Sequence, residues 1–258
     1  MEHLTGFIGR KAILYADHFL NLAGFFYRML VMIFKSPREG RAVVKRVIIE
    51  QIYFTGVQAL PIVIPAALLI GSSLIVVFSK LSGQYDIGKM ITILIIRELG
   101  PLSAATIVIL RSATAVAVEM SYMNVFNEID AIEMTGIDPM RILGIPRIIG
   151  ITSAIFCLFI IFDLVAIMGG YSVVLFLMRA PVGNLLEQVG KAITGGDIAV
   201  GFIKALLFGM AMTVICIYKG FREEKQLTAI PQVVSATAVQ CFFFCLLMNI
   251  LVSAIFYL

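Results

Sequence analysis

The stretch MITILIIRELGPLSAATIVIL, residues 90–110, is apolar except for RELGP at residues 97–101. The flanking runs read as parts of one membrane-spanning helix, and a charge at the bilayer centre costs about 2.5–3.5 kcal/mol on insertion scales. Arg97 and Glu98 therefore need a partner side chain, a polar ligand or a water-filled cavity inside the membrane. Because Pro101 has no amide hydrogen to donate to the Arg97 carbonyl, we expect the helix to bend here and to leave that carbonyl available as an acceptor.

The composition of the whole chain is that of an integral membrane protein. Of its 258 residues, 60% are hydrophobic and 14% are charged, and the mean hydropathy is +1.02. Soluble domains contain about 45–50% apolar and about 25% charged residues. Because a helix needs about 20 apolar residues to cross the bilayer, the chain has room for five or six spans and none for a sizeable soluble domain.

Five apolar segments predict an all-α integral membrane protein with five transmembrane helices. The run between Glu50 and Lys80 has no formal charge, and Pro61 and Pro65 are expected to bend it. With its preceding elbow this first span covers residues 36–79. The remaining spans are expected at residues 90–123, 148–178, 198–218 and 233–258.

Residues 1–35 have helical periodicity but too many charges to cross the membrane. Leu22, Phe26 and Met29 belong to an apolar stripe, while Arg28 and other polar residues lie elsewhere. This pattern predicts an interfacial amphipathic helix. It is followed by Ser36-Pro37-Arg38-Glu39, a sequence with the order of residues that starts a new helix.

The distribution of basic residues predicts the orientation of the chain. With a cytoplasmic N-terminus, the inner segments carry thirteen Lys and Arg residues and the outer loops carry four. Positive charge favours the cytoplasmic side, so we expect the C-terminus outside. The first 50 residues show no apolar core followed by a small-residue cleavage site, and no cleavable signal peptide is expected.

Cysteine and histidine usage gives no indication of a metal site. Cys157, Cys216, Cys241 and Cys245 lie in apolar runs, where cysteine usually serves as a small packing residue. The only histidines, at positions 3 and 18, are far from them in the sequence. No metal is therefore expected on this chain.

The charges of RELGP favour a site for an amphipathic molecule. Arg97 lies about 10 Å below the outer end of its span at 1.5 Å per residue, and neighbouring side chains on a helix point about 100° apart. Arg97 and Glu98 are thus not expected to pair with each other. A bent helix with both charges would suit a molecule with a charged head group and apolar tails.

Three other readings of the intramembrane charges stay open. Arg97 and Glu98 could form buried salt bridges that only hold the bundle together. With Lys204 they could line the path of a channel or ion-coupled carrier. The chain could also be an anchor for a protein complex. Arg111 is expected to pair with another helix, and the small residues Ala113, Ala117 and Ser121 would let a helix pack closely.

The connection after the second span predicts a short cytoplasmic helix at residues 127–136. Asn127 stands at a capping position, Gly136 can end the helix in the left-handed conformation, and Asp138-Pro139 can begin the next. Its apolar edge consists of Ile129 and Ile132, and its charges are Glu128, Asp130 and Glu133. Such a helix can lie in the interface without a partner or dock into a groove of a second protein.

Residues 97–147, RELGPLSAATIVILRSATAVAVEMSYMNVFNEIDAIEMTGIDPMRILGIPR, closely resemble the permease subunit of the MlaE/YrbE family of lipid-transporting ABC transporters. The matches include the RELGP motif, Arg111, Glu119, the EIDAIE run, the GIDP turn with Arg141, and the Pro146-Arg147 pair. A weaker resemblance extends over most of the chain. The family usually has an aspartate in its fifth span, where this chain has Asn249.

The resemblance implies a single permease domain over residues 1–258, working as a homodimer in the bacterial inner membrane with a periplasmic C-terminus. It implies a phospholipid substrate, a cytoplasmic ATPase dimer, a small STAS-domain subunit and a periplasmic oligomer of mammalian-cell-entry (MCE) domains. The chain contains no G-x-x-x-x-G-K-[ST] loop, so ATP and Mg²⁺ are expected only on the ATPase and no cofactor on this chain.

The resemblance also gives roles to particular residues. Arg97 and Glu98 would contact the lipid, and Leu74 and Phe78 of the first span complete the predicted lipid-binding set. The helix at residues 127–136 would couple the permease to the ATPase through Glu128, Asp130, Ile132, Glu133, Gly136 and Asp138. No catalytic residue is expected, because the chain would be a transporter subunit and not itself an enzyme.

Overall fold

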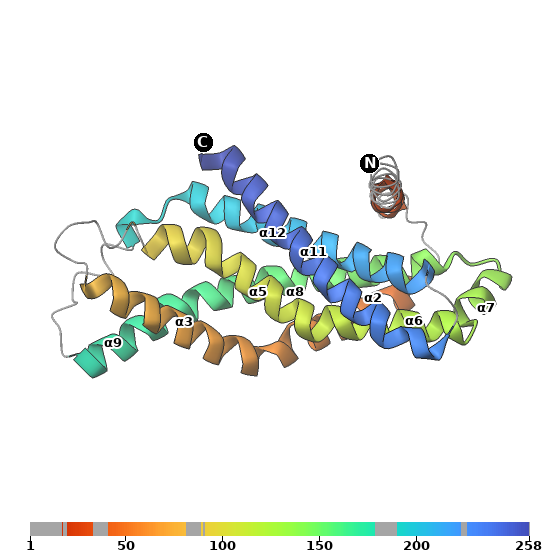
Figure 1. Ribbon diagram of the computed structural model, residues 1–258, viewed down its shortest axis with the longest axis horizontal. Coiled ribbons are helices and arrows are strands. Elements are labelled where there is room, and N and C mark those ends of the chain that lie inside the picture. Colours follow the sequence, from red (N-terminus) through yellow and green to blue (C-terminus); the bar gives the residue numbers. More distant parts are fainter. Residues whose placement is uncertain are drawn as a thin grey trace, which may run out of the picture.

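A computed structural model of the chain describes residues 17, 20–32, 41–80, 89, 91–178, 190–222 and 226–257. Within these ranges the chain is helical apart from short turns, and it contains no strand there. Five helices are long and apolar enough to cross a membrane, and they run side by side along the length of the molecule (Figure 1). The predicted all-α class with five spans is confirmed. The five spanning segments are Val44–Phe78, Ile93–Val125, Met140–Val173, Gly195–Phe221 and Leu227–Phe256.

The first span is interrupted just before its first proline. Helix α2 (Arg41–Thr55) is followed by the short 3₁₀ turn η1 (Val57–Ala59), and α3 (Leu60–Lys80) then continues the span. Pro61 cannot donate a backbone hydrogen bond to the preceding turn, which explains why the break lies there. Pro65 lies inside α3. The change of direction between α2 and α3 is visible in Figure 1.

The second span contains two wide π-helical turns. The π-helix η2 (Thr92–Leu99) leads into α5 (Gly100–Val108), and a second π-turn, η3 (Ile109–Ala113), leads into α6 (Thr114–Val125). Isolated π-turns are uncommon and often occur at functional positions. Each of these two contains one of the arginines of the span, Arg97 in η2 and Arg111 in η3.

The third span begins at Met140 and not, as predicted, near Ile148. It consists of the π-turn η4 (Met140–Gly144), α8 (Ile145–Leu164), the π-turn η5 (Val165–Gly169) and α9 (Gly170–Met178). The early start follows from Asp138, whose carboxylate accepts a hydrogen bond from the Met140 amide at 2.9 Å and so caps the new helix.

The early start also places Arg147 inside the membrane helix. Its side chain is 3% exposed and pairs with Glu119 of α6 at 2.7 Å. Glu119 is half exposed at the same end of the bundle. The connection between the second and third spans is thereby tied to the bundle by an ion pair between neighbouring helices.

The fourth span is the centre of the bundle. Helix α11 (Gly195–Arg222) packs against α8, α6 and α12 (Ile230–Tyr257), which follows the short 3₁₀ turn η6 (Leu227–Ala229). In its most apolar stretch 67% of α11 is buried, whereas the corresponding value for the first and the last span is 22%. The outer spans therefore leave broad apolar faces to the surroundings.

The predicted stripe of small residues lies in the core, where it lets two helices approach. Ala113, Ala117 and Ser121 are buried. The thiol of Cys216 on α11 donates to the Ala113 carbonyl at 3.4 Å, which shows how close the helices come. Cys216 itself is buried beside Cys241 of α12, with the two sulfur atoms 4.0 Å apart.

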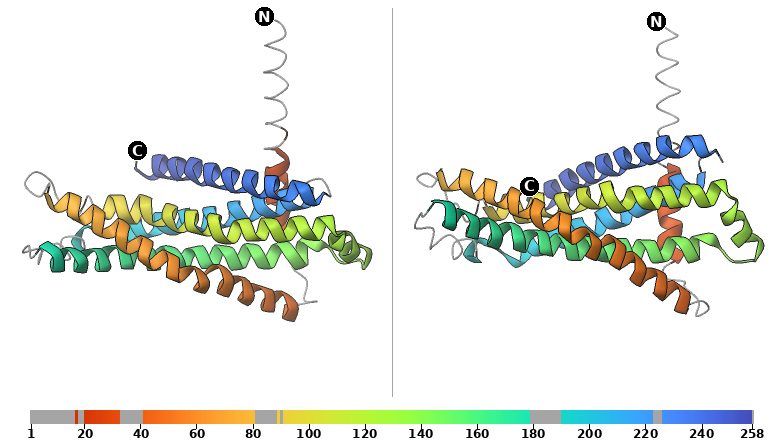
Figure 2. Two further views of the ribbon diagram at one scale, coloured as in Figure 1. Left: turned by 60° about the horizontal axis from the view of Figure 1, so that its bottom comes forward. Right: turned by 90° about the horizontal axis from the view of Figure 1, so that it is seen from below.

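The N-terminal helix Leu20–Met32 crosses the bundle instead of following it. Both views of Figure 2 show it nearly perpendicular to the long helices, nearer the α7 end of the molecule than the α9 end. Leu22 and Met29 are buried, and the Phe25 ring meets the Tyr218 ring edge-on at 5.4 Å. The predicted apolar stripe thus faces the bundle in the part that the structure describes. The earlier part of the predicted helix and the Ser36–Glu39 helix start lie outside the described residues.

Candidate functional site

Spans two, four and five meet at the bend of RELGP. Pro101 follows the π-turn η2 in the first turn of α5, and it cannot donate to the Arg97 carbonyl. That carbonyl instead accepts a hydrogen bond from the Lys204 ammonium group of α11 at 2.8 Å. The acceptor that proline was expected to leave available is therefore used by a charge from another span.

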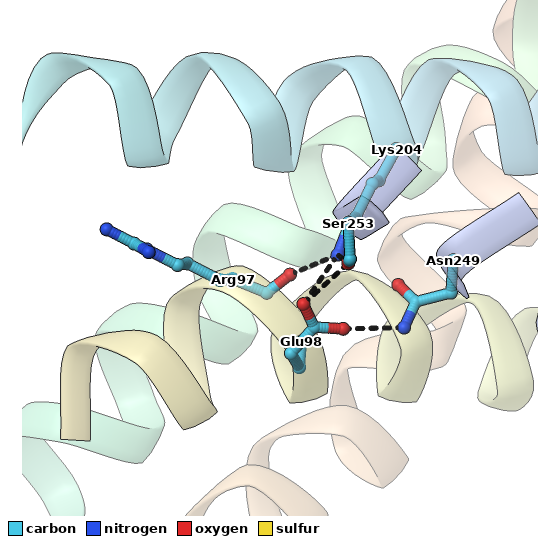
Figure 3. A network of polar contacts seen from close by, with 5 residues as sticks. All are labelled: Arg97, Glu98, Lys204, Asn249 and Ser253. Atoms are coloured by element: carbon cyan, nitrogen blue, oxygen red, sulfur yellow. Dashed lines mark hydrogen bonds and ion pairs between the residues drawn. The ribbon is translucent and has the colours of Figure 1, made fainter. Parts of the chain in front are cut away.

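Glu98 is the anionic centre of this cluster. One carboxylate oxygen accepts from Lys204 at 3.1 Å and from the Ser253 hydroxyl at 2.6 Å. The other accepts from the Asn249 amide nitrogen at 2.6 Å. Figure 3 shows these side chains converging from η2, α11 and α12. We call Glu98, Lys204, Asn249 and Ser253 the Glu98 cluster.

Lys204 donates all three of its ammonium hydrogens within the Glu98 cluster or to the backbone beside it. Its side chain is 0% exposed, and its three ammonium hydrogens match three acceptors, the Arg97 carbonyl, Glu98 and the Ser253 hydroxyl at 2.7 Å. Burying a lysine in this way is costly unless it is paired and hydrogen-bonded. Glu98 keeps 31% of its side chain exposed. The anion therefore stays accessible while the cation does not.

Arg97 points away from the Glu98 cluster, as Figure 3 shows. Its guanidinium group pairs with Asp197 at 2.5 Å, and 21% of the Arg97 side chain is exposed. Asp197 also accepts hydrogen bonds from the amide and the hydroxyl of Thr194, at 3.0 and 2.7 Å. The expectation that Arg97 and Glu98 do not pair with each other is confirmed, because each pairs with a different residue of α11.

Sequence reasoning did not identify Asp197 or Thr194 as site residues. The signal was present, because a threonine followed three residues later by an acid is the pattern of a capping box at a helix start. The same pattern explains why α11 begins at Gly195. It did not indicate that the capping carboxylate also faces the arginine of another span.

Gly100 of RELGP is required by a close approach from the third span. A methyl group at this position would collide with a carboxylate oxygen of Asp163 in α8. Any larger side chain at this position would require the Asp163 carboxyl group to move. Gly100, which lies between Glu98 and Pro101, therefore leaves room for a buried acid next to the bend.

The other predicted lipid-binding residues lie on a different helix. Leu74 and Phe78 are one turn apart on α3, and both are half-buried against the hydrophobic core. The charged residues join spans two, four and five, whereas Leu74 and Phe78 belong to span one. Their contact with lipid remains a prediction.

Arg111 has the structural role expected of it. Its guanidinium group donates to the Phe54 carbonyl at 2.5 Å and to the Gln58 side chain at 2.8 Å. It also lies 4.8 Å from the centre of the Phe54 ring. Arg111 thus fastens span two to the break in span one, away from the Glu98 cluster.

The predicted short helix after span two is α7 (Glu128–Met134), at one end of the bundle (Figure 1). Gly136 ends it with a φ of +81°, as expected. Asn127 stands at the start with a φ of 58°, but its side chain makes no capping hydrogen bond. Ile129 is buried and Ile132 is half-buried, so the apolar edge of α7 faces the bundle.

The face of α7 that remains accessible is acidic and apolar. Glu128 and Glu133 are exposed, Asp130 is half-buried, and Gly136 and Asp138 are exposed just beyond the helix. Met134 is 88% exposed. The Tyr122 and Phe126 rings at the end of α6 stack with their centres 6.1 Å apart and are also exposed. This end of the bundle offers a surface of mixed character to a partner.

Comparisons with known proteins agree on the family of this chain. The family model described as Permease MlaE matches residues 48–255. A probable ABC transporter permease protein of Rickettsia conorii is 25% identical over 259 residues, which cover 99% of this chain and 98% of the relative. The intermembrane phospholipid transport system permease protein MlaE of Haemophilus influenzae is 27% identical over 215 residues, covering 81% and 82% of the two chains. The chain therefore belongs to the MlaE permease family.

Proposed function

We propose that this chain is the transmembrane permease subunit of an ABC transporter that moves phospholipid between the inner membrane and a periplasmic lipid carrier. The observation that carries the proposal is the pair of partly exposed charges, Arg97 and Glu98, held at a bend inside the membrane by other spans. The similarity to the ABC transporter permease protein of Rickettsia conorii and to the intermembrane phospholipid transport permease protein of Haemophilus influenzae supports it. The chain contains no nucleotide-binding loop, and a separate ATPase would hydrolyse ATP with Mg²⁺.

In this proposal the ion pairs Arg97–Asp197 and Glu98–Lys204 are formed while no lipid is bound. The phosphate of an entering lipid would compete with Asp197 for the Arg97 guanidinium group, which forms two parallel bonds with phosphate as readily as with carboxylate. An ammonium head group would approach the exposed part of Glu98. The acyl chains would lie against the apolar faces of the outer spans, where Leu74 and Phe78 are placed. Exchange of one ionic partner for another avoids an unpaired charge in the membrane.

Two variants that break the same ion pair test this role of Arg97. Arg97→Gln removes the guanidinium group, while Asp197→Asn removes its protein partner and leaves the guanidinium group in place. The transporter would be extracted gently with its ATPase, and the phospholipid retained per permease would be measured by mass spectrometry. We expect Arg97→Gln to lose bound lipid and Asp197→Asn to keep it or gain more. Equal losses in both variants would show that the pair is only structural, as a membrane anchor requires.

The exposed end of the bundle is the proposed docking site of the ATPase. Glu128, Asp130, Ile132, Glu133, Gly136 and Asp138 belong to α7 or to the turn after it. Because Ile129 and Ile132 attach α7 to the bundle, a push on the helix would be passed to span two through α6. Closure of the ATPase dimer would thereby shift the bend at RELGP and expel the lipid.

A charge reversal tests the docking site. Glu133→Lys places the opposite charge on the exposed face of α7, and we expect it to reduce co-purification of the ATPase. Glu50→Lys is the matched control, because Glu50 is also an exposed acid, paired with Arg46 on α2. Equal co-purification of both variants would contradict a docking role for α7.

The wider assembly is part of the same proposal. The chain would act as a homodimer with a cytoplasmic N-terminus and a periplasmic C-terminus, together with an ATPase dimer, a STAS-domain subunit and a periplasmic MCE-domain oligomer. Only 22% of the most apolar stretch of the first span and of the last span is buried, so these two spans are suited to contact a second copy and lipid. The crosswise N-terminal helix Leu20–Met32 is oriented as a helix in the membrane interface would be.

A further inference from the structure

Asp163 is an acid that the proposed mechanism does not use. It lies in α8, within the third span, and only 9% of it is exposed. Its Oδ1 atom is buried without a hydrogen-bond donor, and no ion pair of Asp163 occurs among the residues that the structure describes. An ionised carboxylate in this setting would lack both solvation and a counter-charge.

The carboxyl group of Asp163 lies directly on the backbone of Gly100. A methyl group at Gly100 would collide with this carboxyl group, which shows that the two helices meet with the acid between them. Gly100 is two residues from Glu98 and one from Pro101. The protonation state of the Asp163 carboxyl group therefore affects the packing at the junction between η2 and α5.

The elements nearest to Asp163 bring no unused cation. Helix α8 packs against α2, α3, α5, α11, η4 and η5. Of these, α5 and η5 contain no charged residue, and α3 contains only Lys80, its last residue. The charges of α2 end at Glu50, and its neighbour Gln51 approaches Gly150, about 20 Å along α8 from Asp163 at 1.5 Å per residue. The only charge of η4 is Arg141, before α8 begins.

Helix α11 and the π-turn η2 have charges near this level, and these charges have partners. Gly201 of α11 faces Phe159, one turn before Asp163. The nearest charged residues of α11 are therefore Asp197, which pairs with Arg97, and Lys204, whose three hydrogens are all donated. Glu98 of η2 is an anion and is paired with Lys204. None of the described charges compensates a negative Asp163.

From this geometry we propose that Asp163 is a proton-binding site inside the membrane, occupied in this conformation and coupled to the bend of span two through Gly100. Burial in a medium of low dielectric constant disfavours the charged form of a carboxyl group, and the cost of an isolated buried carboxylate is avoided when it binds a proton. Release of the proton would require water or a cation to reach the Asp163–Gly100 contact. Because the Asp163 carboxyl group packs directly against Gly100, it must then turn away from Gly100, or the η2–α5 junction must move away from α8.

Infrared spectroscopy tests the proton directly. The complete transporter, with its ATPase and in lipid, would be measured at neutral pH for the C=O stretching band of a protonated carboxyl group. We expect this band to shift when aspartate carboxyl carbons are labelled with ¹³C and to disappear in Asp163→Asn, which keeps the shape but cannot ionise. Glu119→Gln is the matched control, because Glu119 is half exposed and paired with Arg147. The band is expected to persist in this control.

The proposal is overturned if no such band occurs, if it does not respond to aspartate labelling, or if it survives in Asp163→Asn. The labelling measurement uses the unaltered protein and so does not depend on whether the variant folds. A second measurement concerns the coupling and rests on the proposed lipid transport. We expect transport by the unaltered protein to fall with rising pH in parallel with the band, and transport by Asp163→Asn to show no such fall. A parallel fall in the variant would overturn the coupling but leave both the proton site and the proposed function intact.

Discussion

Replacing Lys204 by methionine would test what holds the bend of span two. Methionine has nearly the same length and keeps the packing, but it removes three hydrogen bonds of 2.7–3.1 Å from a side chain that is 0% exposed. Interhelical polar contacts in membranes are worth about 0.6 kcal/mol on average and about 1.7 at most. Three such contacts therefore amount to roughly 2–5 kcal/mol.

The free energy of unfolding of Lys204→Met is expected to fall by about 3 kcal/mol, near the middle of this range, because two effects oppose each other. Removal of the cation leaves the partly buried Glu98 carboxylate with only Asn249 and Ser253 as donors, which adds to the loss. The exposed 31% of Glu98 regains some solvation and reduces it. A change of this size corresponds to a fall of about 6–12 °C in the melting temperature of a chain of this length.

The assay is a denaturant titration of the permease in mixed micelles, combined with a double-mutant cycle. Lys204→Met, Glu98→Gln and the double variant would be compared, with Lys219→Met at the other end of α11 as control. We expect the double variant to lose at least about 1 kcal/mol less than the sum of the single variants, because the two residues share one contact. A loss below about 1 kcal/mol for Lys204→Met, or additive losses, would refute the idea that Lys204 fixes the bend.

Three further substitutions have expected outcomes. Gly100→Ala should lower the free energy of unfolding by about 1–3 kcal/mol because its methyl group collides with Asp163, and Asp163→Ala in the same chain should restore part of it; an unchanged melting temperature would contradict the close contact. Asn249→Asp replaces the donor 2.6 Å from Glu98 by a second carboxylate and should lower the free energy of unfolding by about 1–3 kcal/mol. This stability should be regained at acidic pH, because a protonated carboxyl group can again donate a hydrogen bond. Gly136→Ala introduces a side chain at a φ of +81°, should cost about 1–2 kcal/mol, and should weaken ATPase co-purification by displacing the end of α7.

Several features of the fold and site followed from local rules. The length of the apolar segments predicted five spans, and the missing amide of Pro101 predicted an available carbonyl at Arg97. The angle between neighbouring residues on a helix predicted that Arg97 and Glu98 have separate partners. Each of these inferences depends on residues within one helix, where the spacing along the sequence determines the geometry.

The partners of these charges could not be derived in the same way. Lys204, Asp197 and Asn249 lie on helices whose rotation and depth relative to span two are set by packing of the whole bundle. The π-turns were missed for a related reason. An extra residue in a turn changes the rotation of everything after it, and no simple sequence rule marks it. The sequence predicted a bend from Pro101 alone, whereas the close approach of Asp163 to Gly100 comes from another span.

The charge balance of the Glu98 cluster bears on how the site can open. Glu98 and Lys204 cancel, and Asn249 and Ser253 are neutral, so the four side chains carry no net charge at rest. While the cluster is closed, no charge in it lacks a partner of opposite sign inside the membrane. If a lipid ammonium group draws Glu98 away, Lys204 keeps the Arg97 carbonyl and Ser253 as acceptors. Asn249, a neutral donor, loses its hydrogen bond to Glu98. Lys204 then keeps two hydrogen bonds but loses its anionic partner, so the bend can yield Glu98 at low cost only to a ligand that also brings an anion close to Lys204.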